Sequence, residues 1–287
     1  MQPAIQPHRP DLHVHTCLSD GQFSPAQVMN RAAENHVDLI AVTDHDTLQG
    51  LVSAREAAME KGIILLGGVE LSAGGAWEVH ILGYGIREDM GRLNALLQQM
   101  REERMARVRK MLVKLKALGM AVELEEIASP QADSLGRAHI GRALVKKGLS
   151  DSLMAAFDKY LAPGRPGYEP RPRREVGQVV RLLREEGAVP VLAHPGLIKM
   201  EREEMLPLLH EWVDQGLMGL EAYHPAHLPT AVKSWDSLAR EHHLLVSGGS
   251  DFHGEDGRHM DIGQVLPYWP TAGEDAAALM KNIADAG

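Results

Sequence analysis

Short apolar segments alternate with amphipathic segments along most of this chain, and this alternation constrains its fold more than any other feature. The apolar segments that we expect to form β-strands are 11–15, 39–43, 63–66, 69–71, 79–84, 189–193, 219–222 and 244–247. The amphipathic segments that we expect to form helices are 25–35, 47–61, 175–186, 203–215 and 228–242. Parallel strands need long crossover connections, which are usually helices. The alternation therefore predicts an α/β fold of parallel βα units, either a barrel or a doubly wound sheet.

The alternation stops between about residues 90 and 175, where helical patterns follow one another. Helices are expected at 93–118, 137–147 and 152–160, and a loop rich in proline and glycine follows at 162–168. Residues 91–175 contain 17 Lys and Arg against 10 Asp and Glu, although the whole chain has a net charge of −9. We therefore predict a main domain of residues 1–90 and 176–287, with an inserted helical cap of residues 91–175 that presents a basic surface to an anionic substrate.

Charge, cysteine content and hydropathy exclude several classes of protein. The net charge of −9 argues against a protein that coats long nucleic acid. Cys17 is the single cysteine, so an internal disulfide is impossible and a reducing compartment is favoured. Residues 1–10 lack the apolar core of a signal peptide, and no apolar run approaches the roughly 18 residues that span a bilayer. We expect a cytoplasmic protein with no membrane partner and no stable long nucleic-acid partner.

Histidine and acidic side chains recur at the ends of the predicted strands. His13 and His15 lie two residues apart, so within a strand they share one face. The other such positions are Asp20, His45, Glu70, His80, His194, Glu221, His224, Asp251 and His253. We expect these side chains to meet at one rim, because α/β barrels and parallel sheets build their sites at the C-terminal ends of their strands.

The donor chemistry of this rim predicts metal binding. Crowded imidazoles and carboxylates need cations to compensate their charge. Imidazole and carboxylate groups without thiolates suit Mn²⁺, Fe²⁺ or Zn²⁺ better than Ca²⁺, and this number of donors could hold two or three divalent ions. A lone histidine is seldom a ligand, so we interpret the remaining isolated histidines as surface or structural residues. These are His8, His36, His210, His242 and His259.

In combination and in order, the motifs resemble those of the PHP (polymerase and histidinol phosphatase) family. They are Asp11-Leu-His-Val-His15, Thr43-Asp-His-Asp46, Gly68-Val-Glu70, Ala193-His-Pro195 and Ser250-Asp-Phe-His253, and the resemblance covers residues 11–86 and 176–265. It implies a distorted seven-stranded βα barrel, a (βα)7 barrel, with a trinuclear metal site in which Glu70 bridges. The implied metal ligands are His13, His15, Asp20, His45, Glu70, His80, His194, Asp251 and His253.

The insertion is similar to the helical cap of stand-alone bacterial PHP phosphoesterases. The similar stretches are residues 134–142 and 159–168. That subgroup includes 3',5'-nucleoside bisphosphate phosphatases and 5'→3' exonucleases that act on short RNA. The chain departs from the subgroup after His-Pro-Gly, where it has Leu197 in place of an arginine and Lys199 two residues further on.

The expected function is metal-dependent hydrolysis of a phosphate monoester of a nucleotide. The substrate would be a 3',5'-bisphosphate nucleotide or the 5' end of a short RNA, and metal-activated hydroxide would be the nucleophile. The expected catalytic residues are Asp20, His45, Glu70, His253 and His224, the last of which would protonate the leaving alkoxide. The expected phosphate-binding residues are Arg137 and Arg142, just over one helical turn apart, with His139, Arg165 and Lys199 as weaker candidates. Asp44 and Asp46 are expected to orient His45 or its neighbours.

Three alternatives stay open at this point. The chain could be a histidinol-phosphate-type or other small-molecule phosphatase, although that does not account for a basic cap of this size. It could be an amidohydrolase, since those barrels also place His-x-His on their first strand. They commonly use a carboxylated lysine as well, and no predicted strand end here presents a lysine. The third alternative is a non-enzymatic metal-binding domain that regulates a nucleic-acid enzyme.

Overall fold

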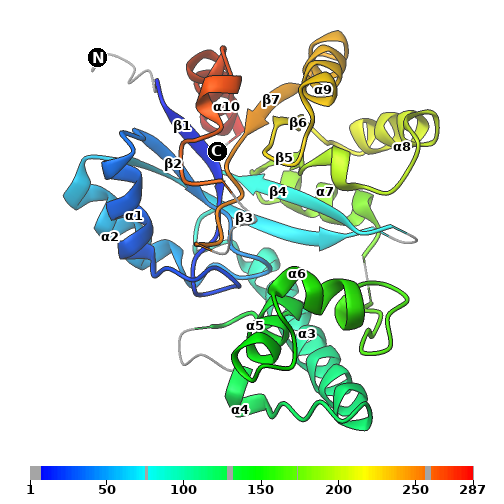
Figure 1. Ribbon diagram of the computed structural model, residues 1–287. Helices are drawn as coiled ribbons and strands as arrows, with labels where there is room; N and C mark the ends of the chain where they lie inside the picture. The colour runs from blue at the N-terminus through cyan, green and yellow to red at the C-terminus, as the bar shows by residue number, and fades with distance from the viewer. Residues whose placement is uncertain (1–7, 75–76, 128–131, 173, 256–259, 287) are drawn as a thin grey trace.

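Seven strands form one sheet that curves into a nearly closed barrel in the computed structural model (Figure 1), which describes residues 8–74, 77–127, 132–172, 174–255 and 260–286. The strands follow their sequence order around the barrel: β1 (Pro10–Val14), β2 (Leu39–Val42), β3 (Ile64–Ala73), β4 (Val79–Tyr84), β5 (Val189–Leu192), β6 (Gly219–Tyr223) and β7 (Leu245–Gly248). The backbone N–H of His15 donates to the carbonyl of Phe252 at 2.9 Å, so the segment after β7 returns beside β1. The predicted α/β barrel with a helical insertion is confirmed.

Strand β4 corrects the expectation of parallel βα units throughout. Among the described residues it is the one strand that pairs antiparallel with its neighbours, β3 and β5, while the other neighbours run parallel. Only five residues separate Ala73 from Val79, which is too short for a crossover helix. As a result the start of β4, where His80 lies, reaches the same rim as the C-terminal ends of the parallel strands.

The segments 63–66 and 69–71, predicted as two strands, belong to the single strand β3. Gly67 and Gly68 continue the strand between them. A Cβ at Gly67 would collide with the carbonyl oxygen of Ile86, so the glycine serves a close backbone approach and does not end the strand.

Helices surround the barrel on its outer face (Figure 1). They are α1 (Pro25–Glu34), α2 (Leu51–Lys61), α7 (Val176–Glu185), α8 (Arg202–Asp214), α9 (Pro229–Glu241) and α10 (Ala272–Ala286). Helix α1 begins as predicted after Ser24, whose hydroxyl accepts from the backbone N–H of Gln27 at 3.3 Å. Helix α10 was not among the helices that we predicted. It is held in part by Asp275, which accepts from the indole N–H of Trp269 at 2.9 Å.

The insertion forms a helical layer over one end of the barrel, below it in Figure 1. It contains α3 (Gly91–Ala117), α4 (Leu124–Ile127), α5 (Arg137–Lys146) and α6 (Leu153–Ala156), which runs into the π-helical turn η1 (Phe157–Leu161). Its fully buried residues form a hydrophobic cluster of their own, which includes Met111, Leu115, Ile140, Leu144 and Leu161. The first half of α3 packs instead into the core of the barrel. One long helix therefore fixes the cap relative to the rim. No helix of the described chain has both the length and the hydrophobicity to cross a bilayer.

Candidate active site

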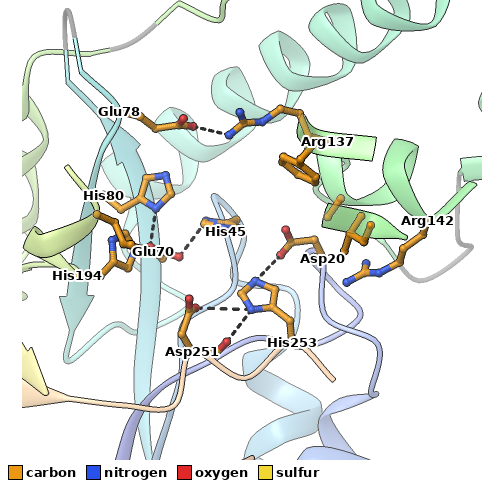
Figure 2. Close-up of a pocket in the computed structure, with 14 residues that line it drawn as sticks. Asp20, His45, Glu70, Glu78, His80, Arg137, Arg142, His194, Asp251 and His253 are labelled. Atoms are coloured by element: carbon orange, nitrogen blue, oxygen red, sulfur yellow. Dashed lines mark hydrogen bonds and ion pairs between the residues drawn. The ribbon is translucent and has the colours of Figure 1, made fainter. Parts of the chain in front are cut away.

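The rim beneath the cap gathers six imidazoles and three carboxylates. The structure places them in four overlapping groups, and within each group one donor atom per residue lies within 4.8 Å of the others. The members are His13, His15, Asp20, His45, Glu70, His80, His194, Asp251 and His253, all nine of the residues that the resemblance implies as ligands. We call this set the rim cluster; seven of its side chains are labelled in Figure 2.

Glu70 lies at the centre of the rim cluster, and its carboxylate is almost fully buried. Five imidazoles face it: His80 at 2.7 Å, His194 at 2.9 Å, His45 at 3.0 Å, His15 at 3.2 Å and His13 at 3.4 Å. Two donors that share a cation at about 2.0–2.2 Å, at angles of about 90–110°, lie about 2.8–3.6 Å apart. Most of the spacings around Glu70 fall in that range.

Two further carboxylates continue the pattern. Asp251 lies 3.3 Å from Nε2 of His13 and 3.2 Å from Nε2 of His15, and Asp20 lies 3.2 Å from Nε2 of His253. The backbones of Asp251 and His194 have positive φ angles of 50° and 26°. Non-glycine residues seldom adopt such angles, and they concentrate at functional sites where the surrounding structure enforces them.

Several nitrogen and oxygen atoms of the rim cluster that could coordinate metal are buried without hydrogen bonds, so these residues fit a group of cations. Within the described chain these atoms include Nδ1 of His15, His45, His80 and His194 and Oδ1 of Asp20. Nδ1 of His45 and of His80 approaches Glu70 without hydrogen-bond geometry. Buried polar atoms normally have partners. Unpartnered lone pairs in and around the rim cluster therefore match divalent ions, and imidazole with carboxylate suits Mn²⁺, Fe²⁺ or Zn²⁺.

The electrostatics of the rim cluster lead to the same conclusion. Burial alone would raise the pKa of Glu70, but His45, His80 and His13 outweigh it and hold that pKa well below its usual range. Burial likewise opposes charge on His15, yet Asp251 and Glu70 raise its pKa to about 10. For His45, burial dominates and lowers the pKa to about 3. Without cations, the carboxylates thus keep some neighbouring imidazoles protonated. Bound metal ions can supply the same positive charge in place of those protons.

Glu221 supports the rim cluster from behind, a role that the sequence did not reveal. One of its oxygens accepts from Nδ1 of His13 at 2.9 Å, and the other accepts from the backbone N–H of His194 at 2.7 Å. This contact turns Nε2 of His13 toward Glu70 and Asp251. The available signal was an acidic residue inside the apolar strand β6, since a buried carboxylate there needs a donor.

Gly249 lets the end of β7 approach β1. A Cβ at this position would collide with the backbone nitrogen and the Cβ of His13. The glycine is therefore required for Asp251 and His253, which follow it, to reach the two histidines of β1.

Asp44 makes contacts that agree with the expected orienting role, whereas Asp46 makes contacts that we did not predict. Asp44 accepts from the backbone N–H and hydroxyl of Thr16, at 2.7 and 2.6 Å, and from the hydroxyl of Ser19 at 2.6 Å, so it shapes the loop that carries Asp20. Asp46 instead binds two arginines of the inserted segment, Arg104 at 2.5 Å and Arg171 at 3.0 Å. The turn after β2, where Asp46 has a φ of 54°, directs its carboxylate toward the cap.

A cavity of about 290 Å³ lies between the rim cluster and the cap (Figure 2). Arg137 and Arg142, both on α5, line it opposite the rim cluster, together with Phe157 and Leu197. Arg137 pairs with Glu78 at 2.9 Å, and its guanidinium carbon lies 5.5 Å from the centre of the Phe157 ring. Nε of Arg142 is buried without a hydrogen-bond partner in the described structure. The cap thus presents two guanidinium groups to a chamber with the rim cluster on its opposite side.

A smaller cavity of about 70 Å³ adjoins the first and shares several of its wall residues, including His45, His80, Glu78 and Arg137. Its other cationic walls are Arg104, Arg107 and Arg171, none of which we predicted as site residues. The basic stretch 101–110 hinted at such a surface. The face of a 27-residue helix that turns toward the barrel, however, depends on packing that the sequence does not display.

Several predicted residues are not part of this chamber. His139 accepts from the backbone N–H of Gly136 at 3.2 Å and caps α5; burial lowers its pKa to about 4. Arg165 and Lys199 are exposed, and the cavities described above include neither of them nor His139. The short helical turn η2 (Pro195–Leu197) after His194 directs Lys199 outward and leaves Leu197 in the wall.

His224 lies beside the rim cluster but is not among the residues that line the chamber, and its role as the acid for the leaving group stays a prediction. Its Nε2 lies 3.3 Å from Asp251, and its Nδ1 accepts from the backbone N–H of Ala226 at 3.1 Å. The ring centre of His224 lies 5.2 Å from that of His194, so the side chain packs against the rim cluster, and the residue also borders a separate, mainly apolar cavity of about 640 Å³ beside α9. His8, His36, His210 and His242 are exposed, and His259 lies outside the described residues.

Comparison with known proteins relates this chain to one protein family and to relatives that match most of its length. Residues 11–162 match the family model described as PHP domain. The chain is 36% identical over 262 residues to the 3',5'-nucleoside bisphosphate phosphatase of Chromobacterium violaceum, covering 90% of this chain and 92% of that protein. It is 33% identical over 249 residues to the 5'-3' exoribonuclease Rnm of Escherichia coli, covering 85% and 84%.

Two solved structures share the fold over almost the whole chain. One, named as an amidohydrolase from Chromobacterium violaceum with bound sulfate and no metal, superposes with a TM-score of 0.82 at 35% identity and covers 90% of this chain and 93% of its own. The other, inferred to be a metal-dependent phosphoesterase from Bifidobacterium adolescentis, has a TM-score of 0.79 at 27% identity and covers 92% and 96%.

Proposed function

Because this chain belongs to the PHP domain family and is a metal-dependent phosphoesterase, we propose that it removes a phosphate monoester from a nucleotide that carries a second phosphate group. A 3',5'-bisphosphate nucleotide or the 5' end of a short RNA has this chemistry. The observation that carries the proposal is the single chamber that joins the rim cluster to the guanidinium groups of Arg137 and Arg142.

We propose the nine residues of the rim cluster as ligands of two or three divalent ions, Mn²⁺, Fe²⁺ or Zn²⁺, with Glu70 shared between sites. When bound, such ions supply Lewis acidity toward phosphoryl oxygens and an activated water nucleophile. Glu221 then fixes the ring of His13, and the loop held by Asp44 positions Asp20. Asp20, His45, Glu70 and His253 line the chamber, so the catalytic roles expected for them are compatible with substrate access.

The cap side of the chamber accounts for the second phosphate. A guanidinium group can bind a phosphate through two parallel N–H donors, and such contacts strengthen where water is excluded. Arg137 is about four-fifths buried, with its side chain 18% exposed, and Nε of Arg142 is also buried. The volume of about 290 Å³ lies at the lower end of the range for small-molecule pockets, which favours a mononucleotide or a single chain end over duplex nucleic acid.

The test combines one variant with a substrate panel. Glu70→Gln should lose bound metal and lower kcat/KM by at least about a hundredfold, because the shared ligand of the site is weakened. Glu274→Gln on α10 removes an exposed carboxylate far from the rim and is the matched control. The panel contains a 3',5'-bisphosphate nucleotide, a 5'-phosphorylated short RNA, a 3'-monophosphate nucleotide, histidinol phosphate and an amide. A preference for histidinol phosphate or the amide, or full activity in metal-depleted Glu70→Gln, would refute the proposal.

A further inference from the structure

Arg137 already pairs with a carboxylate inside the chamber, that of Glu78. This carboxylate differs in burial from that of Asp46, which pairs with Arg104 and Arg171. Glu78 accepts from Arg137 at 2.9 Å, as Figure 2 shows, and its side chain is 34% exposed. Asp46 is fully buried and is held by Ser72, Arg104 and Arg171 together. Asp46 therefore acts as a fixed counter-ion, whereas Glu78 has solvent into which it can move.

The backbone places Glu78 directly beside the rim cluster. Glu78 immediately precedes β4 and lies two residues before His80. Both residues line the large cavity and the small one. An anion that bridges from the rim cluster to Arg137 must therefore enter the volume that the Glu78 carboxylate borders.

The charge balance of the small cavity favours such an exchange. Four guanidinium groups line it, from Arg104, Arg107, Arg137 and Arg171. Asp46 pairs with two of them but offsets only one of their two positive charges, and the side chain of Arg107 donates to the backbone carbonyl of Glu169 at 2.7 Å. With Glu78 included, the net charge of the side chains around this cavity is still positive. Without Glu78, a mostly buried Arg137 would be left unpaired, which is costly.

We propose that Glu78 is an exchangeable internal counter-ion of Arg137, which the second phosphate of the substrate must displace. This inference rests on the proposed function. A terminal phosphate carries nearly two negative charges near neutral pH and can replace the carboxylate on Arg137, whereas a phosphodiester carries one charge and gains little by the exchange. Glu78 is therefore a specificity-determining residue that selects nucleotides with a terminal second phosphate over internal phosphodiesters.

The experiment measures binding without turnover. Adenosine 5'-monophosphate and the dinucleoside monophosphate ApA are titrated calorimetrically into metal-free protein at low and at high salt. Glu78→Gln should tighten the binding of both ligands, since a competing charge is removed, and the gain for ApA should be roughly three- to tenfold, the scale of a partly exposed ion pair. The ratio of the two affinities, which favours the monophosphate in wild type, should shrink accordingly. The gain in affinity from Glu78→Gln should be smaller at high salt.

The matched control is Glu185→Gln, which removes the same charge from an exposed pair with Arg92 on the outside of the barrel. It should leave both affinities within twofold of wild type. Weaker binding of adenosine 5'-monophosphate to Glu78→Gln, or an affinity unchanged within twofold, overturns the inference. Arg137→Ala separates the two levels of the argument. If it does not weaken monophosphate binding, the proposed function itself fails; if it does while Glu78→Gln has no effect, only the role of Glu78 fails.

Discussion

The contact between Asp46 and the two arginines of the insertion predicts how firmly the cap is attached to the barrel. Both guanidinium groups meet the same carboxylate oxygen, Oδ2, with Arg104 at 2.5 Å and Arg171 at 3.0 Å. The side-chain exposures are 0% for Asp46, 9% for Arg104 and 6% for Arg171. Asp46→Asn keeps the size of the side chain and an acceptor for Ser72, but it replaces the charged oxygen by a neutral amide.

The expected loss follows from this burial. Removing one partner of a buried ion pair costs about 3–5 kcal/mol, because the remaining charge is left without compensation. A chain of 287 residues unfolds with an entropy of about 0.6 kcal/mol/K, so the midpoint of thermal unfolding should fall by about 5–8 °C. The cavity of about 70 Å³ beside Arg104 and Arg171 leaves room for water next to the guanidinium groups, which favours the lower end of that range.

The assay is differential scanning calorimetry of both proteins at equal metal content, supported by urea unfolding. Glu103→Gln is the control, because Glu103 forms a two-bonded pair with Arg174 that also lies in the insertion but is more exposed. It should cost about 1 kcal/mol or less. A midpoint within 2 °C of wild type for Asp46→Asn, or an equal loss in the control, would refute the view that a buried charge at Asp46 fastens the cap.

Two further predictions concern the cap. Arg137→Ala and Arg142→Ala should each raise KM for a 3',5'-bisphosphate nucleotide by about tenfold or more, the scale of one lost charge-assisted hydrogen bond, with little change for an aryl phosphate. Exposed Arg165→Ala should change neither KM, and equal effects on both substrates would exclude a specific clamp. His139 has a folded-state pKa lowered to about 4, below its unfolded value of 6.5, so its contribution to stability is complete above pH 6.5 and is lost as pH falls toward 4. Between pH 7 and 4.5 wild type should therefore lose about 2–3 kcal/mol more than His139→Asn in paired unfolding measurements, and a constant difference between them would contradict this.

The residues of the rim cluster could be anticipated because local rules place them. The spacing of His13 and His15 fixes a shared face in any strand, and the loop positions of His45, His194 and Asp251 follow from where the apolar segments end. These rules depend only on backbone periodicity. The direction of β4 could have been predicted by the same kind of rule, since five connecting residues allow a hairpin and exclude a crossover.

The cationic side of the chamber depended on tertiary packing. Arg104 and Arg107 reach it because α3 packs one particular face against the barrel, and Arg171 reaches it from the segment that leads back to the barrel. His224 occupies a strand-end position like that of His194 and its ring packs against it, yet His194 lines the chamber and His224 does not. A strand end specifies where a side chain begins, whereas the turn that follows decides where it points.

By itself, the sequence determined an α/β fold of βα units with imidazole and carboxylate groups at its strand ends, because strand periodicity and segment ends are properties of short stretches of chain; the choice of a barrel came from the family resemblance. Only the tertiary structure decided that Glu221 holds His13, that Asp46 fastens the cap and that Glu78 is paired with Arg137. Each of these contacts joins residues distant in sequence. Burial determines the strength of each, and burial is a property of the packed whole.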